Sequence, residues 1–175
     1  MGDPKKSSRT WQGPKHPWIK ERLVKEIELI GRYGLKNKRE LWKAETLARN
    51  FRHKARATLG LPAGAREAAL KAIFDKLKEL GLVSGEVSLD AVLGLTAEQI
   101  LERRLQTIVF KKGLARSVHE ARQFITHGHI AIGGRRVTSP GYLVSLKEEP
   151  LVSYAPGSPL LQRAAQEGGE SVSGA

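Results

Sequence analysis

The stretch from 103 to 146 constrains the fold most, because the spacing of its apolar residues changes from helical to strand-like within it. A first helix is predicted by apolar residues at three- and four-residue spacing, namely Leu101, Leu105 and Ile108. Gly113 ends this helix after two lysines, as is typical of a glycine just beyond a helix C-terminus. Ser117 and Glu120 form a capping box that opens a second helix, and Gly128 ends it.

Beyond the second helix the apolar residues alternate, which predicts a small antiparallel sheet. Ile130 and Ile132 mark a first strand, and Gly133-Gly134 supplies a type I′ hairpin turn before Val137 resumes the sheet. A Pro-Gly turn at 140–141 precedes a further alternating run of Tyr142, Val144 and Leu146. The predicted fold class is therefore α+β, with a mainly helical N-terminal region followed by a module of two helices and a small antiparallel sheet.

Basic side chains gather on this module: Arg103, Arg104, Lys111, Lys112, Arg116, Arg122, Arg135 and Arg136. The order and spacing of its motifs resemble the S4 RNA-binding domain in Gly113 to Ser117, Glu120 to Gln123, His127 to Ile130 and Val137 to Tyr142. Among proteins with this domain, the chain is most similar to the archaeal type of the small-subunit ribosomal protein S4 family. Gly133 stands where the family commonly has Asn, which also tolerates the left-handed turn. Gly141 replaces a common Ser, and we expect a softer turn there.

The charge balance restricts the classes of partner. The 175 residues include 30 Lys and Arg against 18 Asp and Glu, which gives a net charge of +12 and a pI near 10.2. This excess of positive charge predicts a polyanionic binding partner, either a nucleic acid or an anionic membrane surface. No apolar run approaches the roughly 18 residues of a spanning helix, and no signal peptide is recognisable. The absence of cysteine excludes disulfides and thiolate metal sites, and a cytoplasmic location fits all of these features.

Composition and periodicity divide the chain into four segments. They are a basic N-terminal arm at 1–16, a helical region expected to bind ribosomal RNA at 17–95, the S4 module at 96–155, and a largely disordered C-terminal tail at 156–175. The arm is either disordered in the free protein or a basic segment that becomes ordered on RNA. Trp11 favours the second interpretation, because a purely solvated tail would give no reason for an indole side chain.

Start and stop signals place the helices of the N-terminal half. Pro17 suits the first turn of a helix that ends at Gly34. Asn37 caps the next helix, which runs to about residue 59. After a break at Pro62 and Gly64, a third helix is predicted by Leu70, Ile73, Phe74, Leu77 and Leu80, with Gly81 as its stop. Two more caps are Ser88, before a short turn to Leu93, and Thr96 with Gln99, before the helix that enters the module.

The second of these helices carries a basic face made of Arg49, Arg52, His53 and Arg56, opposite Phe51 and Ala55. Trp42 lies on this basic face rather than on the apolar one. Two explanations stay open. The indole either packs under the arm or the preceding helix, or it stacks on RNA while the arginines hold phosphates.

No catalytic or metal site is predicted. Ser117 near His119 is better explained as a helix cap, because Glu120 completes the capping box. His127 and His129 have no evident third metal ligand, so their imidazoles are expected to contact backbone or phosphate. The residues outside the module are too short and too helical for a catalytic α/β domain. The sequence therefore predicts a protein that is not an enzyme and has no cofactor.

Folded RNA is recognised by its shape and through contacts with its backbone. Arginine suits such contacts, because its guanidinium group can donate two hydrogen bonds to phosphate oxygens. Arg104, Arg116 and Arg122 are the predicted phosphate anchors. Phe124 is expected in the core, and Tyr142 either at the core edge or on RNA. The complete predicted RNA-binding set is Arg49, Arg52, Arg56, Arg103, Arg104, Lys111, Lys112, Arg116, Ser117, Arg122, Gln123, His127, His129, Arg135, Arg136 and Tyr142.

The family resemblance implies a structural protein of the small ribosomal subunit that binds its ribosomal RNA directly and nucleates assembly of the subunit body. It also implies a place beside ribosomal protein S5 and near the messenger RNA entry path, with an influence on decoding accuracy. An alternative is a stand-alone RNA chaperone or ribosome-rescue factor with the same domain. A third is a DNA-binding regulator, although Val118 and His119 suit a recognition helix poorly.

Overall fold

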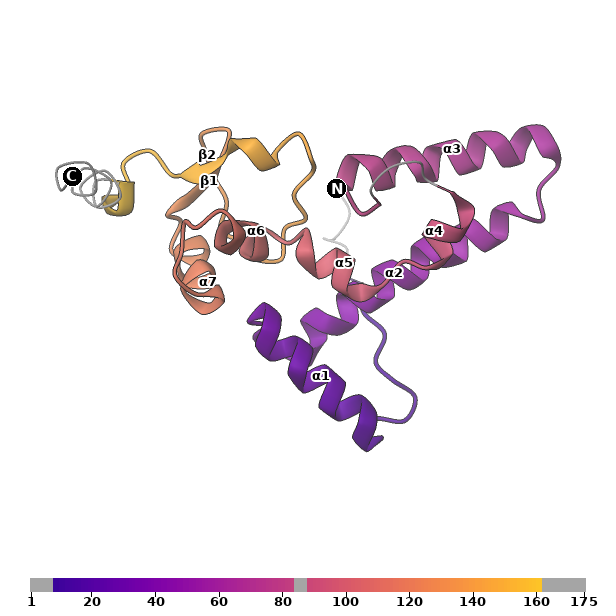
Figure 1. Ribbon diagram of the computed structural model, residues 1–175, viewed down its shortest axis with the longest axis horizontal. Helices are drawn as coiled ribbons and strands as arrows, with labels where there is room; N and C mark the ends of the chain where they lie inside the picture. The colour runs from indigo at the N-terminus through magenta and orange to yellow at the C-terminus, as the bar shows by residue number, and fades with distance from the viewer. Residues whose placement is uncertain (1–7, 84–87, 162–175) are drawn as a thin grey trace, which may run out of the picture. The chain divides into compact units, whose positions relative to one another are not determined.

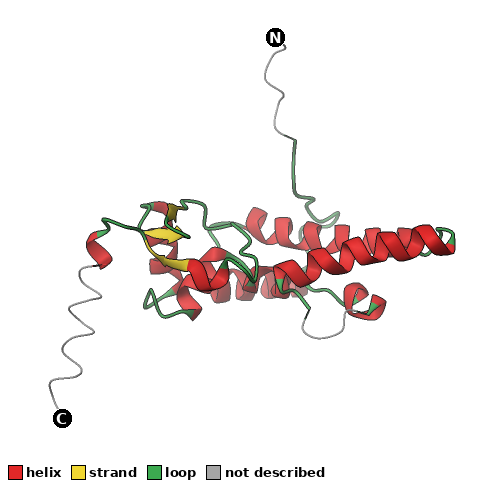
Figure 2. Ribbon diagram, turned by 90° about the horizontal axis from the view of Figure 1, so that it is seen from above, coloured by secondary structure: helices red, strands yellow, loops and turns green. Residues whose placement is uncertain are grey.

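The computed structural model describes residues 8–83 and 88–161, and it divides into two compact units (Figure 1). The helical unit comprises Met1–Ile73 and Ser88–Leu101, and the mixed unit comprises Phe74–Val87 and Glu102–Ala175. In Figure 2 the strands all belong to the mixed unit. The fold is α+β, as predicted. Within the described ranges, every helix is too short or too polar to cross a membrane.

The helical unit contains α1 (Lys20–Tyr33), α2 (Lys38–Thr58), the first part of α3 (Ala63–Leu80), α4 (Leu89–Leu93) and nearly all of α5 (Ala97–Glu102). The expected caps are confirmed. Gly34 ends α1 in the left-handed region with φ 57°, and the Asn37 side chain accepts a hydrogen bond from the Glu40 amide. Leu41, Ala44, Ala48 and Ala55 are buried along α2, and Val92 and Leu95 are buried with them.

Two helix starts differ from the prediction. α1 begins at Lys20, because residues 17 and 18 form a turn rather than the first helical residues. α3 begins at Ala63, directly after Pro62, so it is longer than its apolar residues indicated. A proline that precedes a helix starts it rather than breaks it, and Gly64 is tolerated in the first turn. Gly81 ends α3 with φ 64°, as predicted.

The mixed unit contains α6 (Leu105–Lys111), α7 (Val118–Thr126), β1 (Ile130–Ile132), β2 (Arg135–Arg136), the short 3-10 helix η1 (Glu149–Leu151) and β3 (Val152–Tyr154). The sheet is antiparallel in the order β2-β1-β3. Gly133 and Gly134 have φ of 56° and 80°, which is the type I′ turn that the sequence predicted. Val137 lies just beyond β2, and its amide donates to the Ile130 carbonyl.

Two features of this unit contradict the sequence prediction. The helix expected through Leu101 and Leu105 is interrupted at residues 103–104, because Arg104 has extended backbone and forms a β-bridge with Leu143. The run from 142 to 146 contributes only that bridge among the described residues, and the strand that completes the sheet is β3. Nearby, the Leu105 amide donates to the Tyr142 carbonyl at 2.8 Å.

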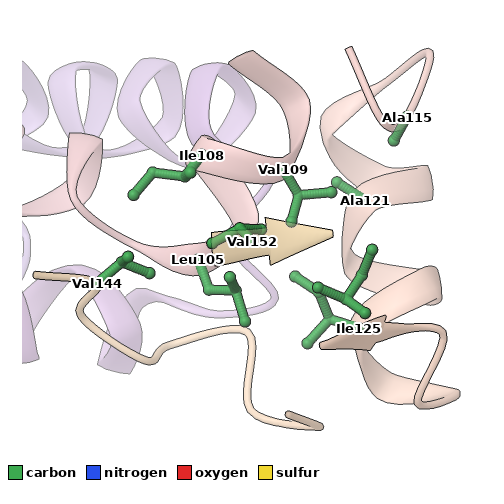
Figure 3. Packing of buried hydrophobic residues seen from close by; sticks show 9 residues of the cluster. Leu105, Ile108, Val109, Ala115, Ala121, Ile125, Val144 and Val152 are labelled. Atoms are coloured by element: carbon green, nitrogen blue, oxygen red, sulfur yellow. The ribbon is translucent and has the colours of Figure 1, made fainter. Parts of the chain in front are cut away.

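The core of the mixed unit lies between α6, α7 and the sheet, as Figure 3 shows. Side chains from all of these elements are buried there: Leu105, Ile108, Val109, Ala115, Ala121, Ile125, Ile130, Val144 and Val152. Burying a large aliphatic side chain contributes about 1.5–3 kcal/mol. Phe124 is half-buried against this cluster, as expected. The core thus fixes α7 and the β1–β2 hairpin, which carry Arg122, Gln123, Arg135 and Arg136 of the predicted RNA-binding set.

Candidate nucleic-acid interface

The start of α7 is held by the predicted cap. The Ser117 hydroxyl accepts the Glu120 amide at 3.1 Å, and the Glu120 carboxylate accepts the Arg116 amide at 2.6 Å. The carboxylate thus reaches the residue before the cap rather than the cap itself. Because the backbone on both sides of residue 116 is fixed, the exposed Arg116 side chain starts from a rigid point.

A buried amide between α6 and α7 positions a second arginine. Gln106 is fully buried, and its Nε2 donates to the Val118 carbonyl at 3.0 Å. Its Oε1 accepts a hydrogen bond from Arg122 Nη1 at 3.3 Å. Sequence reasoning missed Gln106, because a glutamine in a short helix gives no sign of burial. The half-buried Arg122 is therefore oriented by a partner 16 positions earlier in the chain.

Two of the predicted RNA-binding cations, Arg103 and Lys112, have partners within the chain. Arg103 Nη1 binds the Glu149 carboxylate at 2.7 Å, and its Nη2 donates to the Val144 carbonyl at 3.1 Å. The Lys112 ammonium donates to the carbonyls of Glu149 and Val152. These contacts fasten the segment from 144 to 152 to both ends of α6.

Arg104 also differs from the picture of an exposed phosphate anchor. It is only 6% exposed, and its Nη2 lies 3.7 Å from the position that a Cβ at residue 141 would take. This is an ordinary van der Waals distance, so the Arg104 guanidinium packs closely against residue 141. In this conformation Arg104 is packed inside the unit rather than presented to a ligand.

The predicted residues that the mixed unit does expose lie on α7, on the β1–β2 hairpin, at the end of α6 and after the second turn. They are Lys111, Lys112, Arg116, Ser117, Gln123, His127, Arg135, Arg136 and Tyr142. Lys111 lies 3.6 Å from the Glu102 carboxylate, an exposed contact of little energy. Arg136 Nη2 donates to the Pro156 carbonyl at 3.5 Å. Exposed cations of this kind are the side chains that can reach phosphate.

The two histidines at the end of α7 differ in environment. His127 is exposed, whereas His129 is half-buried with Nδ1 3.1 Å from the Ser158 hydroxyl. Their ring centroids are 6.4 Å apart. Across the residues that the structure describes, no three potential metal ligands come together.

Tyr142 has an internal partner as well as an exposed ring. Its hydroxyl donates to Glu148 at 2.8 Å, and this hydrogen bond raises the pKa of Tyr142 above its ordinary value. Hydrogen bonds from the Ser145 backbone and then from Tyr142 lower the pKa of Glu148. The tyrosine hydroxyl is thus held by the protein, while the residue as a whole is 38% exposed.

A buried carboxylate organises the start of the helical unit. Glu26 is 4% exposed and accepts hydrogen bonds from Arg22 at 2.8 Å and from Trp42 at 3.2 Å. The Lys38 ammonium lies 3.0 Å from its other oxygen. Burial opposes ionisation, but the hydrogen bonds from Lys38, Trp42 and Arg22 outweigh it and lower the pKa of Glu26.

The question that Trp42 posed is answered by packing. Its ring lies 5.3 Å from the ring of Trp11, and its indole N–H is bound by Glu26 on the preceding helix. Trp42 therefore packs under the arm and against α1 at once. On the same face, Arg49 and Arg56 are exposed and Arg52 is half-buried.

The fold and these basic surfaces define the class first: the chain is an RNA-binding protein that carries an S4 domain, matched at residues 103–149. Residues 5–102 match the "Ribosomal protein S4/S9 N-terminal domain".

Curated relatives cover nearly the whole chain. It is 65% identical over 167 residues to "Small ribosomal subunit protein uS4" of Hyperthermus butylicus, with 95% of each chain covered. Identity to the proteins of the same name is 57% in Ignicoccus hospitalis, over 95% of this chain and all of that one, and 57% in Sulfurisphaera tokodaii, over 98% of each.

The chain therefore belongs to the family of small-subunit ribosomal protein S4, of the archaeal type. Members of this family are structural, RNA-binding components of the small ribosomal subunit in the cytoplasm and are not enzymes. Matches to both domain models, over residues 5–102 and 103–149, do not favour the stand-alone RNA chaperone or rescue factor.

Proposed function

We propose that the chain binds small-subunit ribosomal RNA through two basic surfaces. The first follows α7 and the β1–β2 hairpin, and the second is the basic face of α2. The observation that carries this proposal is the exposure of cations on elements that buried cores hold rigid. The proposed contacts are Arg49, Arg52, Arg56, Lys111, Arg116, Gln123, His127, Arg135, Arg136 and the ring of Tyr142.

The remaining predicted site residues act mainly by positioning these contacts. Arg103 and Lys112 fasten the segment from 144 to 152, and Arg122 lies against Gln106. Arg104 and His129 support the same surface from buried or half-buried positions, and the exposed Ser117 caps α7. This division follows from burial and partners, since a guanidinium that is already bound inside the protein is a poorer phosphate ligand than an exposed one.

The functional division of the chain is part of the proposal. The arm at 1–16 and the helices at 17–95 form one RNA-binding region, and the module at 96–155 forms the other. The predicted disorder at 156–175 falls mostly outside the described residues.

Family membership supports a location in the subunit. We propose that the protein lies beside ribosomal protein S5 and near the messenger RNA entry path, nucleates assembly of the subunit body and influences decoding accuracy. This location and these roles are supported by membership in the family.

Salt dependence tests the RNA proposal. Affinity for a transcript of archaeal small-subunit ribosomal RNA should fall steeply with salt, because each neutralised phosphate releases counterions. The double variant Arg135→Ala and Arg136→Ala should reduce the slope of log K against log salt by about two, roughly one per cation. Lys76→Ala, which removes an exposed lysine outside the proposed surfaces, is the matched control. A flat binding curve for the unchanged protein, or an unchanged slope in the double variant, would contradict the proposal.

A further inference from the structure

The N-terminal arm is attached to α2 by stacked side chains. The guanidinium of Arg9 lies 3.7 Å from the centre of the Trp11 ring, and its Nε donates to the Trp11 carbonyl at 2.9 Å. Trp11 in turn lies 5.3 Å from Trp42, with the ring planes tilted by 32°. A cation over an indole face and a pair of neighbouring aromatic rings both attract, so the two contacts stabilise the same arrangement.

The next residue of the arm adds polar contacts to α2. The Gln12 amide donates to the Thr46 hydroxyl at 3.0 Å, and its side-chain oxygen accepts a hydrogen bond from Arg49 at 2.6 Å. Thr46 is buried and also donates to the Trp42 carbonyl at 2.7 Å. Arm and helix are therefore joined by a stack and by hydrogen bonds in consecutive residues.

Gly13 lies beside the three stacked side chains. A Cβ at this residue would meet Trp11 at 3.5 Å, Arg9 at 3.7 Å and Trp42 at 3.8 Å. All of these are ordinary van der Waals distances, so the chain passes closely over the stack without strain. The arm is thus packed on the helix over several residues rather than attached at one contact.

Docking the arm brings separate arginines together. Arg39 lies 5.6 Å from the Trp11 ring, Arg9 stacks on that ring, and Arg49 is bound to the neighbouring Gln12. Across residues 8–83 and 88–161, no acidic side chain forms an ion pair with any of these arginines. Glu45 attracts Arg49 electrostatically, but its carboxylate is 3.5 Å from Arg22.

We propose that Trp11 and Trp42 dock the arm on α2 in the free protein and thereby build a binding site for RNA backbone phosphates from Arg9, Arg39 and Arg49. Charge complementarity selects RNA as the occupant, because guanidinium groups without carboxylate partners match phosphate oxygens. Docking before binding also removes the ordering cost that a disordered arm has at the moment of association. This inference rests on the proposed RNA-binding function.

The docked state has a spectroscopic signature without RNA. Two indoles at the observed separation should give an exciton-coupled circular dichroism band, which Trp11→Ala should abolish. Trp18→Ala is the matched control, because Trp18 is 87% exposed and stacks on neither indole in the described structure. Absence of the band in the unchanged protein, or its persistence in Trp11→Ala, would overturn the docking.

The RNA-binding experiment uses the full chain and the same ribosomal RNA transcript. Trp11→Ala should reduce the slope of log K against log salt by about one, although it removes no charge, because Arg9 is then no longer held in place. Arg9→Ala leaves the indole pair intact and should have the same effect, and the double variant should lose no more than either single variant. Thermal unfolding verifies that the helices stay folded.

The outcomes separate the two proposals. A steep slope in the unchanged protein that persists in both Trp11→Ala and Arg9→Ala overturns the arm site alone. A flat slope in the unchanged protein overturns the proposed function and the arm site together. Retained affinity for RNA combined with lost binding of a subunit protein would assign the arm to a protein partner and also overturn the inference.

Discussion

Two pairs of arginines, one pair in each unit, differ in burial. In the helical unit, Arg49 and Arg56 lie on the exposed surface of one long helix. In the mixed unit, Arg103 and Arg104 are inside, although the sequence shows them as part of an equally basic run. Charge alone therefore does not define an interface. In the mixed unit, the side chains of Arg103 and Arg104 are largely buried and contribute to internal packing. On the long helix α2, Arg49 and Arg56 remain exposed.

The largest expected effect on stability concerns Trp42 in the helical unit. Trp42→Ala removes the ring under Trp11 and leaves Glu26 without its indole donor. Because the ring is only partly buried, we expect a loss of about 3 kcal/mol, at the low end for a large aromatic. Chemical denaturation followed by helical circular dichroism measures it. An unchanged midpoint would mean that Trp42 is not an anchor.

A second variant addresses the mixed unit. Arg103→Ala should cost about 2 kcal/mol, because it removes charged hydrogen bonds to Glu149 and to the Val144 carbonyl. Lys111→Ala is the control, since its contact with Glu102 is exposed and contributes about 0–1 kcal/mol. Thermal unfolding of both variants makes the comparison. If Lys111→Ala destabilises the protein more than Arg103→Ala does, the assignment of internal and external cations is wrong.

The internal contacts of Arg103 could not be predicted from the sequence. Helix caps at Asn37 and Ser117 and the glycine turns were predictable, because their signals lie within a few residues. The partner of Arg103 lies 46 positions later, and no local pattern connects the two. The same limit applies to the site, where exposed cations and buried ones have identical sequence signals.

The missed strand has a similar cause. β3 is short, and its pairing partner β1 lies about twenty residues away, so neither alternation nor a turn signal marks it. The break at Arg104 depends on its bridge to Leu143, which is likewise distant in sequence. Tertiary pairing here overrides a helical pattern that was correct on either side of the break.

Acid sensitivity should also differ between the units. The folded-state pKa of Glu26 lies below its ordinary value of 4.5, so the unfolded chain takes up the proton first. Ionised Glu26 therefore contributes stability above pH 4.5 that is lost as the pH falls through the folded pKa. Glu26→Gln should flatten the decline of unfolding free energy with acid.

The matched variant in the mixed unit is Glu148→Gln. The pKa of Glu148 is lowered as well, mainly by the Ser145 backbone, but its side chain is less buried than that of Glu26. We expect the same direction and a smaller change. Denaturant unfolding on both sides of pH 4.5 measures both variants. If the unfolding free energy of Glu26→Gln falls with acid as steeply as that of the unchanged protein, the role of Glu26 is contradicted.

The smallest expected effect concerns Tyr142, because its hydroxyl is bound by Glu148 and its ring is exposed. If the ring alone meets RNA, Tyr142→Phe should keep the affinity for ribosomal RNA, and Tyr142→Ala should lower it. Glu148→Gln should bring the raised pKa of Tyr142 back toward 10.0, which an alkaline titration of tyrosine absorbance detects. Tyr142→Phe serves as the reference that removes this titration. Reduced RNA binding by Tyr142→Phe at unchanged stability would show that the hydroxyl leaves Glu148 for the RNA, and Tyr142 would then resemble the exposed cations rather than the internal ties of its own unit.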